Sequence, residues 1–378
     1  MRAVMAESIA APWQKAPWLK DPWQQLLDAQ ARYAHAIAIE AVPGLGAEAM
    51  LKDYVALRLC EHASRRSGAL ACGQCASCHW LASGQHPDLR IVRPAAFEAA
   101  HALSEPTVDE EASETKGSDR KLSHEIRIDQ IRPLAGFLQI GSHRAGARIV
   151  WLEPAQWLNR SAANALLKML EEPGEGALWI LLTDRLSSLL PTIRSRCICL
   201  KVRPPVAKDA EVFLKALIEA QPASSAQAPA PTSNMLSLAL GLSGNAPWSA
   251  QQRILDPVLE AQGSWLHTLA EMPDTWFSTL ARQWAEHQPE QWFELLERWA
   301  IDLLQAVYQL EPLYFKAFAE AAARRAKGID PNRCFKLIEQ LYAMKASLRH
   351  PLNPRLHAES ALLLYANFSN INREKEAT

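Results

Sequence analysis

Four cysteines lie close together in the sequence and have the spacing of metal ligands. Cys60, Cys72, Cys75 and Cys78 follow the pattern C-x11-C-x2-C-x2-C. Thiolates spaced in this way can converge on one ion, and a fourth thiolate from the end of the preceding helix would complete the tetrahedral shell of a structural zinc site. Four sulfur ligands leave no open coordination position, so zinc would stabilise the chain rather than catalyse a reaction. The pattern predicts a zinc module near residues 60–78.

Two other interpretations of these cysteines remain. An iron–sulfur cluster is one, because C-x2-C-x2-C also begins the ferredoxin run, but that run continues with a further Cys and Pro. Here His79 and Trp80 follow Cys78, which favours zinc. His79 could replace one sulfur, although a histidine beside a complete set of four cysteines is more often a bystander. Ordinary buried cysteines are the other interpretation, and the clustering disfavours it.

A glycine-containing turn has the frame of a phosphate-binding loop. Residues 43–46 (PGLG) stand between an expected strand and an expected helix, where backbone N–H groups and the helix N-terminus can hold phosphate. The side chains of such a loop are absent, because Ala47 stands in place of the lysine and Glu48 in place of the Mg²⁺-binding hydroxyl. We therefore expect a degenerate loop, formed by Gly44, Gly46, Ala47 and Glu48, that binds no ATP.

The expected strand over residues 148–153 also lacks part of the residue pattern of an active ATPase. Glu153 stands at the position of a metal-binding acid, but Pro154 stands where a catalytic acid would orient water. Proline has no side-chain group that could do so. Taken alone, a glycine-containing turn between a strand and a helix is also compatible with no phosphate chemistry at all.

Length and composition exclude several classes of protein. The chain has 378 residues, of which 49% are hydrophobic and 21% charged, as in a globular protein of two or three domains. The 40 Lys and Arg balance the 41 Asp and Glu, so strong independent binding to nucleic acid is not expected. No apolar stretch approaches the ~18 residues of a transmembrane helix, and the N-terminus lacks the pattern of a secretory signal. We expect a cytoplasmic protein without a membrane partner.

Short apolar stretches alternate with longer amphipathic ones in the first two hundred residues. The apolar stretches predict strands, and the amphipathic ones predict helices. Near-continuous apolar strands separated by helices are typical of a parallel sheet in a doubly wound α/β fold. The expected strands are 35–42, 89–92, 148–153, 177–183 and 197–202, and the expected helices are 47–61, 129–139 and 162–172.

Two segments interrupt this order, and the pattern changes after the second. Residues 98–125 gather acidic side chains and predict a mobile insertion, whereas residues 222–233 have no charge and predict a linker. Beyond the linker the strand-like stretches disappear. Apolar residues recur at helical spacing within 292–307 and 335–342, which predicts a helical last third.

Several segments, taken in order, resemble the bacterial clamp-loader subunits of the AAA+ family. The resemblance extends over about residues 20–205, and the tail near residues 353–359 is similar to the end of their collar domain. Because the loop lacks Lys and Ser or Thr, the chain resembles a non-hydrolysing subunit rather than the ATP-hydrolysing gamma/tau type. The resemblance rests on Pro43–Gly46, the cysteine cluster, His86–Asp88, Ile128–Arg132, Asn164–Lys168 with Leu170–Pro173, and Leu189–Cys197.

The resemblance implies three domains and one site residue. An AAA+ parallel-sheet domain with a P-loop-like turn and a zinc insertion would occupy residues 1–204, a small helical lid 205–250, and an all-α collar for oligomerisation 251–378. Ser195, Arg196 and Cys197 would form the motif that presents Arg196 as an arginine finger to ATP on the adjacent subunit. A guanidinium at a γ-phosphate stabilises transition-state charge, and comparable fingers raise rates by about 1,000-fold or more.

The resemblance also implies a function and partners. The chain would be a non-hydrolysing subunit of the DNA polymerase III clamp loader, in a hetero-pentameric ring with gamma/tau and delta subunits. Through that ring it would help to load the β sliding clamp onto primed DNA. The alternative is an active AAA+ ATPase with an atypical phosphate loop. A zinc-ribbon nucleic-acid-binding protein is a weaker possibility, which the balanced charge disfavours.

Overall fold

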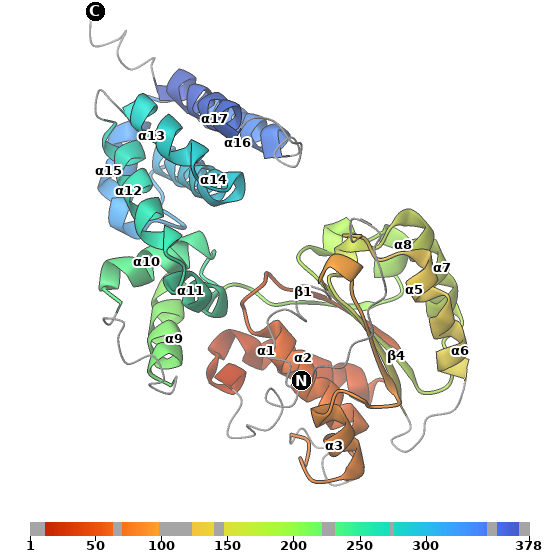
Figure 1. The fold of residues 1–378 in the computed structure, drawn as a ribbon. Coiled ribbons are helices and arrows are strands. Elements are labelled where there is room, and N and C mark those ends of the chain that lie inside the picture. Colours follow the sequence, from red (N-terminus) through yellow and green to blue (C-terminus); the bar gives the residue numbers. More distant parts are fainter. Residues whose placement is uncertain are drawn as a thin grey trace, which may run out of the picture. The chain divides into compact units, whose positions relative to one another are not determined.

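The protein is described by a computed structural model that separates into two compact units, Met1–Pro204 and Pro205–Thr378 (Figure 1). Each unit is described by itself. The expected acidic insertion (98–125) and linker (222–233) lie outside the described residues, except for the last three residues of each. The described residues are 12–62, 70–97, 123–139, 147–220, 231–272, 276–345 and 354–369.

A five-stranded parallel sheet forms the centre of the first unit. Its strand order is β2-β3-β4-β1-β5, and every neighbouring pair is parallel. The apolar side chains of β3 and β4 are buried along their whole length, as expected when helices cover both faces of a sheet. The predicted parallel α/β fold is thus confirmed. The strands are β1 (Ala36–Glu40), β2 (Leu89–Val92), β3 (Arg148–Leu152), β4 (Ala177–Thr183) and β5 (Ile198–Lys201).

Helices cover the two faces of this sheet. In Figure 1, α1 and α2 lie on one side of the sheet, and α5 to α8 lie on the other. These elements are η1 (Pro12–Lys15), α1 (Pro17–Ala31), α2 (Ala47–Leu59), α3 (Ala76–Ala82), α5 (Ile128–Ile131), α6 (Pro133–Gln139), η3 (Ala155–Trp157), α7 (Arg160–Glu171), η4 (Leu186–Ser188) and α8 (Pro191–Arg194).

All three expected helices differ from prediction in their bounds. Helix α2 ends at Leu59, two residues before the predicted end. The helix expected over residues 129–139 is divided into α5 and α6 at Pro133, because proline lacks the N–H of a continuing helix and clashes with the preceding turn. Helix α7 begins two residues earlier than expected, because the Asn159 side chain accepts a hydrogen bond from the Ala162 amide at 2.9 Å and so caps the helix. It ends before Pro173 as predicted.

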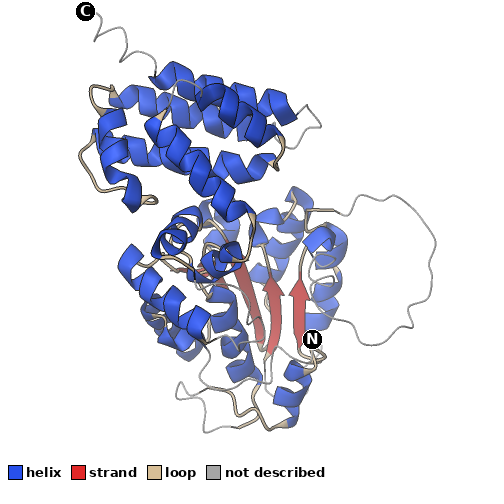
Figure 2. Ribbon diagram, turned by 60° about the vertical axis from the view of Figure 1, so that its left-hand side comes forward, coloured by secondary structure: helices blue, strands red, loops and turns tan. Residues whose placement is uncertain are grey.

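All secondary structure in the described part of the second unit is helical (Figure 2). Buried residues from α9 to α17 form one continuous core, in which the rings of Trp284 and Trp292 stack with centroids 4.8 Å apart. The division into lid and collar at residue 250 stays a prediction. The helices are α9 (Ala207–Glu219), α10 (Ser233–Leu242), α11 (Pro247–Ile254), α12 (Val258–Glu271), α13 (Trp276–Ala285), α14 (Pro289–Val307), η5 (Lys316–Phe318), α15 (Ala319–Ala326), α16 (Pro331–Lys345) and α17 (Pro354–Ser369).

A buried carboxylate organises the loop that follows α14. Asp302 accepts hydrogen bonds from the amides of Leu313, Tyr314 and Phe315, at 2.8, 3.1 and 2.7 Å. These bonds satisfy three backbone donors that the fold removes from water.

Within the described residues, none of the helices in either unit is long and apolar enough to cross a membrane.

Candidate functional site

The predicted cysteine cluster comes together between the end of α2 and the start of α3. Cys60 caps the C-terminal end of α2, and Cys75 caps the N-terminal end of α3. The Sγ atoms of Cys72 and Cys78 lie 3.8 Å apart, and the Cys72 amide lies 3.5 Å from Sγ of Cys60. Residues that are up to 18 positions apart in sequence thus gather in one small volume.

The surroundings of the Cys72 sulfur suit a thiolate, whereas burial raises the pKa of the Cys60 and Cys78 thiols. The Gln74 and Cys75 amides donate to Sγ of Cys72 at 3.4 and 3.3 Å, and the Cys78 amide donates to Sγ of Cys75 at 3.5 Å. The bond from Gln74 is the main reason that the pKa of the Cys72 thiol falls to about 6. Since the thiolate is the form that binds metal, the donor set fits a structural zinc ion.

His62 is a member of the cluster that sequence reasoning missed. Its Nδ1 atom lies 3.4 Å from Sγ of Cys72. The possible ligand atoms of Cys60, His62, Cys72 and Cys75 all lie within 4.8 Å of one another. The C-x-H spacing from Cys60 to His62 could have indicated this histidine. His79, the histidine considered from the sequence, is not in that group.

The cysteine cluster is joined to the sheet by the predicted His86–Asp88 motif. The Nδ1 atom of His86 accepts the Asp88 amide at 3.1 Å, so Nε2 carries the proton and donates to Oγ of Ser77 in α3, 2.9 Å away. Asp88 also pairs with Arg148 of β3 at 3.4 Å, with both side chains buried. The motif therefore connects α3 to the strands β2 and β3 and has a structural role.

The segment predicted as a degenerate phosphate loop connects β1 to α2. Gly44 and Gly46 have φ angles of 84° and 85°, which favour glycine. Ala47 is buried where a lysine would be needed, and Glu48 is exposed in the first turn of α2. Trp18 of α1 donates its indole N–H to the Leu45 carbonyl at 2.9 Å. This hydrogen bond fixes the loop against α1.

The acid at the expected metal-binding position is already paired. Glu153 is buried, and its Oε1 atom accepts from Nε of Arg93 at 2.7 Å and also from Nη2 of Arg93. Burial raises the pKa of the Glu153 carboxyl, although Arg93 opposes the shift. The exposed Glu48 also raises that pKa. Oε2 has no hydrogen-bond partner among the described residues, but the Arg93 guanidinium balances the negative charge that would attract Mg²⁺. No sequence spacing pointed to Arg93.

The predicted finger motif lies at the surface directly after α8. Arg196 places Nη2 2.5 Å from Oε1 of Glu171 and donates from Nη1 to the Thr192 carbonyl at 3.0 Å. Ser195 donates its hydroxyl to the same carbonyl at 3.0 Å. Burial raises the pKa of the Cys197 thiol to about 12, so this cysteine stays neutral and packs against the core. Of the three residues of the motif, only Arg196 carries a charge.

The half-buried carboxylate of Glu40, at the end of β1, supports the segment that leads to this motif. Oε2 of Glu40 accepts the Leu186 amide at 2.7 Å, and Oε1 pairs with Nζ of Lys201 at 3.1 Å. Burial by itself would raise the pKa of Glu40, but the Leu186 amide and Lys201 together lower it. Glu40 therefore positions η4, the turn that leads into α8 and Arg196.

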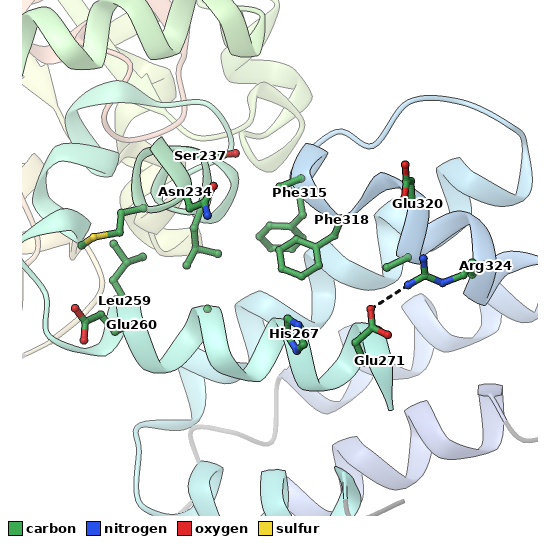
Figure 3. Close-up of a pocket in the computed structure, with 15 residues that line it drawn as sticks. Asn234, Ser237, Leu259, Glu260, His267, Glu271, Phe315, Phe318, Glu320 and Arg324 are labelled. Atoms are coloured by element: carbon green, nitrogen blue, oxygen red, sulfur yellow. Dashed lines mark hydrogen bonds and ion pairs between the residues drawn. The ribbon is translucent and has the colours of Figure 1, made fainter. Parts of the chain in front are cut away.

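A groove of about 750 Å³ lies in the second unit, lined by α10, α12, η5 and α15 (Figure 3). Leu259, Phe315 and Phe318 form part of its apolar wall. The ion pair drawn in Figure 3 joins Glu271 to Arg324 at 3.0 Å, so these two charges neutralise each other. None of the residues predicted as a site lines this groove.

Comparison with known proteins gives a consistent result. The family model described as DNA polymerase III, delta subunit, matches residues 19–206. The DNA polymerase III subunit delta' of Pseudomonas aeruginosa is 33% identical over 241 residues, which are 64% of this chain and 60% of that relative. The subunit delta' of Escherichia coli K12 is 31% identical over 180 residues, 48% of this chain and 46% of that relative. The chain thus spans about half of the length of these relatives.

One solved structure, a DNA polymerase III gamma subunit-related protein of Thermotoga maritima, superposes with a TM-score of 0.44 at 17% identity. That superposition covers 91% of this chain and 100% of the other. The assignment rests on the sequence matches, which agree with the motifs of the first unit. The chain belongs to the delta' family of bacterial DNA polymerase III clamp-loader subunits.

Proposed function

We propose that this chain is a clamp-loader subunit that does not hydrolyse ATP and that helps to load the β sliding clamp onto primed DNA. The observation that supports this most is the ion pair between Arg93 and Glu153, and the burial of Ala47 at the position of the lysine agrees with it. ATP hydrolysis in a P-loop protein needs a lysine at the phosphates and an acid that is free to hold Mg²⁺. Here the lysine is replaced and the acid is occupied.

The same proposal gives Arg196 a role in a neighbouring subunit. Its guanidinium lies at the surface, and its only charged contact among the described residues is Glu171. Presented to the γ-phosphate of ATP held next door, it would stabilise the charge that develops in the transition state. The chain would then assist hydrolysis by its gamma/tau partner without a nucleotide of its own.

The helical second unit offers a surface that suits assembly with gamma/tau and delta subunits in a hetero-pentameric ring. Helix α16 carries Phe335 and Tyr342, seven residues apart, and α17 carries Leu356 and Leu363 at the same spacing. All four side chains are about half exposed. Helices α16 and α17 are neighbours in the fold. Exposed apolar groups at this spacing support the collar role proposed for residues 251–378.

We further propose one structural zinc ion in the cysteine cluster, held by Cys60, Cys72 and Cys75 with Cys78 or His62 as the fourth ligand. The amide donors at the sulfur atoms support this. Four protein ligands would close the shell, so the ion would stabilise the module between α2 and α3 and take no part in catalysis. The site of action would be the cytoplasm.

Reconstitution tests the proposed function directly. The full chain is mixed with gamma/tau and delta subunits, the β clamp and primed DNA, and clamp loading and ATPase activity are measured with and without it. Restoration of loading by a chain that shows no ATP turnover on its own would support the proposal. Mg²⁺-dependent turnover by the isolated chain would instead support the alternative of an active ATPase with an atypical loop.

A further inference from the structure

We propose that the groove in the second unit binds a peptide segment of a protein partner, in which aromatic or long aliphatic side chains are flanked on both sides by lysine or arginine. The groove has a volume of about 750 Å³ and is lined by α10, α12, η5 and α15 (Figure 3). None of the exposed apolar residues of α16 and α17 lines it. The groove is therefore a surface separate from the one attributed to the collar.

The apolar side chains of the groove suit a peptide anchor. Met235 and Leu238 come from α10 and Phe318 from η5, and all three are only partly covered by the core of the second unit. Leu259 and Phe315, which also line the groove, are buried. Apolar side chains that are open on one side can pack around the apolar side chain of a partner and remove it from water.

A glycine keeps one wall of this groove low. Gly263 lies in the interior of α12, where glycine is less favourable than alanine, and it lines the groove. A Cβ atom at this position would lie 3.2 Å from Cδ2 of Leu238, which is another residue of the groove. A larger residue at 263 would therefore displace Leu238 or fill the groove.

Two glutamates at opposite ends of the groove define the charge of its occupant (Figure 3). Glu260 lies in the first turn of α12 and Glu320 in the first turn of α15, and both are exposed. Neither has an ion-pair partner among the described residues, whereas Glu271 and Arg324 pair with each other at 3.0 Å. Charge complementarity thus favours an occupant with a basic residue on each side of its apolar anchor.

Polar side chains along α10 favour a peptide over a purely apolar ligand. Asn234 and Ser237 line the groove, and neither side chain has a hydrogen-bond partner in the described part of the chain. An amide and a hydroxyl can each donate and accept, as the backbone of a peptide requires. An apolar anchor, two basic flanks and a hydrogen-bonding backbone together describe the occupant that we propose.

Fluorescence anisotropy of the full-length chain with three labelled synthetic peptides tests this proposal. The peptides share one core of phenylalanine and leucine, which is flanked on both sides by two lysines, two serines or two glutamates. We expect the lysine-flanked peptide to bind most tightly and to lose affinity as the salt concentration rises. Glu260→Lys and Glu320→Lys should each weaken its binding by about 5-fold or more. Glu290→Lys, in the first turn of α14 and outside the groove, is the matched control.

The apolar part of the groove is tested in the same assay. Phe318→Ala should weaken binding of the lysine-flanked peptide by about 10-fold, because it removes part of the wall around the anchor. Gly263→Leu should abolish binding, because its side chain fills the groove. The charge reversals concern exposed residues, so they test the proposal even if either of these two variants fails to fold.

Three results would overturn the proposal. They are equal affinity for the lysine- and glutamate-flanked peptides, no binding of any of the three up to millimolar concentration, and a loss in Glu290→Lys as large as in Glu260→Lys. Dimers of the full chain that form with rising concentration and disappear in Gly263→Leu would assign the groove to a second copy instead. None of these measurements depends on clamp loading or on ATP.

Discussion

Arg196 and Glu171 form an ion pair at the surface of the first unit, with Nη2 and Oε1 2.5 Å apart. The two side chains are 35% and 50% exposed. An ion pair with this exposure contributes only ~0 to 1 kcal/mol. The pair, together with the bond from Arg196 to the Thr192 carbonyl, gives the guanidinium a defined position. In the proposed role, a phosphate bound to a neighbouring subunit would displace Glu171 at small cost.

Replacing Arg196 should reduce hydrolysis in the assembled ring and leave assembly intact. In Arg196→Ala the neighbouring ATP site loses its positive charge in trans, so turnover at that one site should fall by about 1,000-fold. The measurement is the DNA- and clamp-stimulated ATPase of the reconstituted complex, with assembly checked by size-exclusion chromatography. Arg194→Ala, at the last residue of α8, is the matched control. Equal turnover in both variants and the wild type would remove the finger role.

Replacing Glu171 should slightly favour ATP hydrolysis in the ring, whereas replacing Arg196 should reduce it. Glu171→Gln removes the charge that competes with phosphate for Arg196. The free energy of such an exposed ion pair is at most ~1 kcal/mol, a factor of ~5 in affinity. We expect the reconstituted complex to reach half-maximal ATPase at a lower ATP concentration, by up to ~5-fold. Glu172→Gln, one residue further along, is the control. Loss of ATPase in Glu171→Gln as large as in Arg196→Ala would mean that Glu171 positions the finger instead.

Glu40 should make the first unit sensitive to acid. Its folded-state pKa lies below the ordinary value of 4.5, because the Leu186 amide and Lys201 favour the carboxylate more than burial disfavours it. Ionised Glu40 therefore stabilises the fold above pH 4.5, and this stabilisation is lost as the pH falls through the lowered pKa. Urea unfolding at several pH values should show a shallower acid loss in Glu40→Gln. Parallel profiles for the variant and the wild type would contradict this.

Removing the carboxylate of Asp302 should destabilise the second unit. Asp302→Ala leaves the amides of Leu313, Tyr314 and Phe315 without their acceptor, at a cost of about 3 kcal/mol or more for the set. Asp302→Asn keeps one acceptor oxygen and should lose less. Chemical unfolding followed by tryptophan fluorescence measures both changes. A loss under about 1 kcal/mol in Asp302→Ala would show that water replaces the carboxylate.

The parallel sheet could be predicted from the sequence because its strands are buried on both faces. A strand such as Ala177–Thr183 must then be apolar throughout, and the pattern is visible without any tertiary information. The division of the helix at Pro133 could also have been predicted, because proline is visible in the sequence. Local rules were sufficient wherever the cause of a structure lay within a few residues.

The contacts made by Glu153 and by the predicted phosphate loop could not be predicted in this way. Arg93 and Glu153 are 60 residues apart, and Trp18 and Leu45 are 27 residues apart. Only the folded sheet brings Arg93, which follows β2, to the end of β3. Such pairs leave no periodic signal in the sequence. The absence of a lysine at Ala47 was therefore visible in the sequence, whereas the ion pair between Glu153 and Arg93 was not.

Equilibrium titration of the isolated full-length chain with Mg²⁺ and ATP tests the central claim most directly. With Ala47 in place of a lysine and Glu153 held by Arg93, we predict no saturable binding up to millimolar ATP and no release of phosphate. Saturable binding at micromolar ATP, together with Mg²⁺-dependent phosphate release that Arg196→Ala leaves unchanged, would contradict the account.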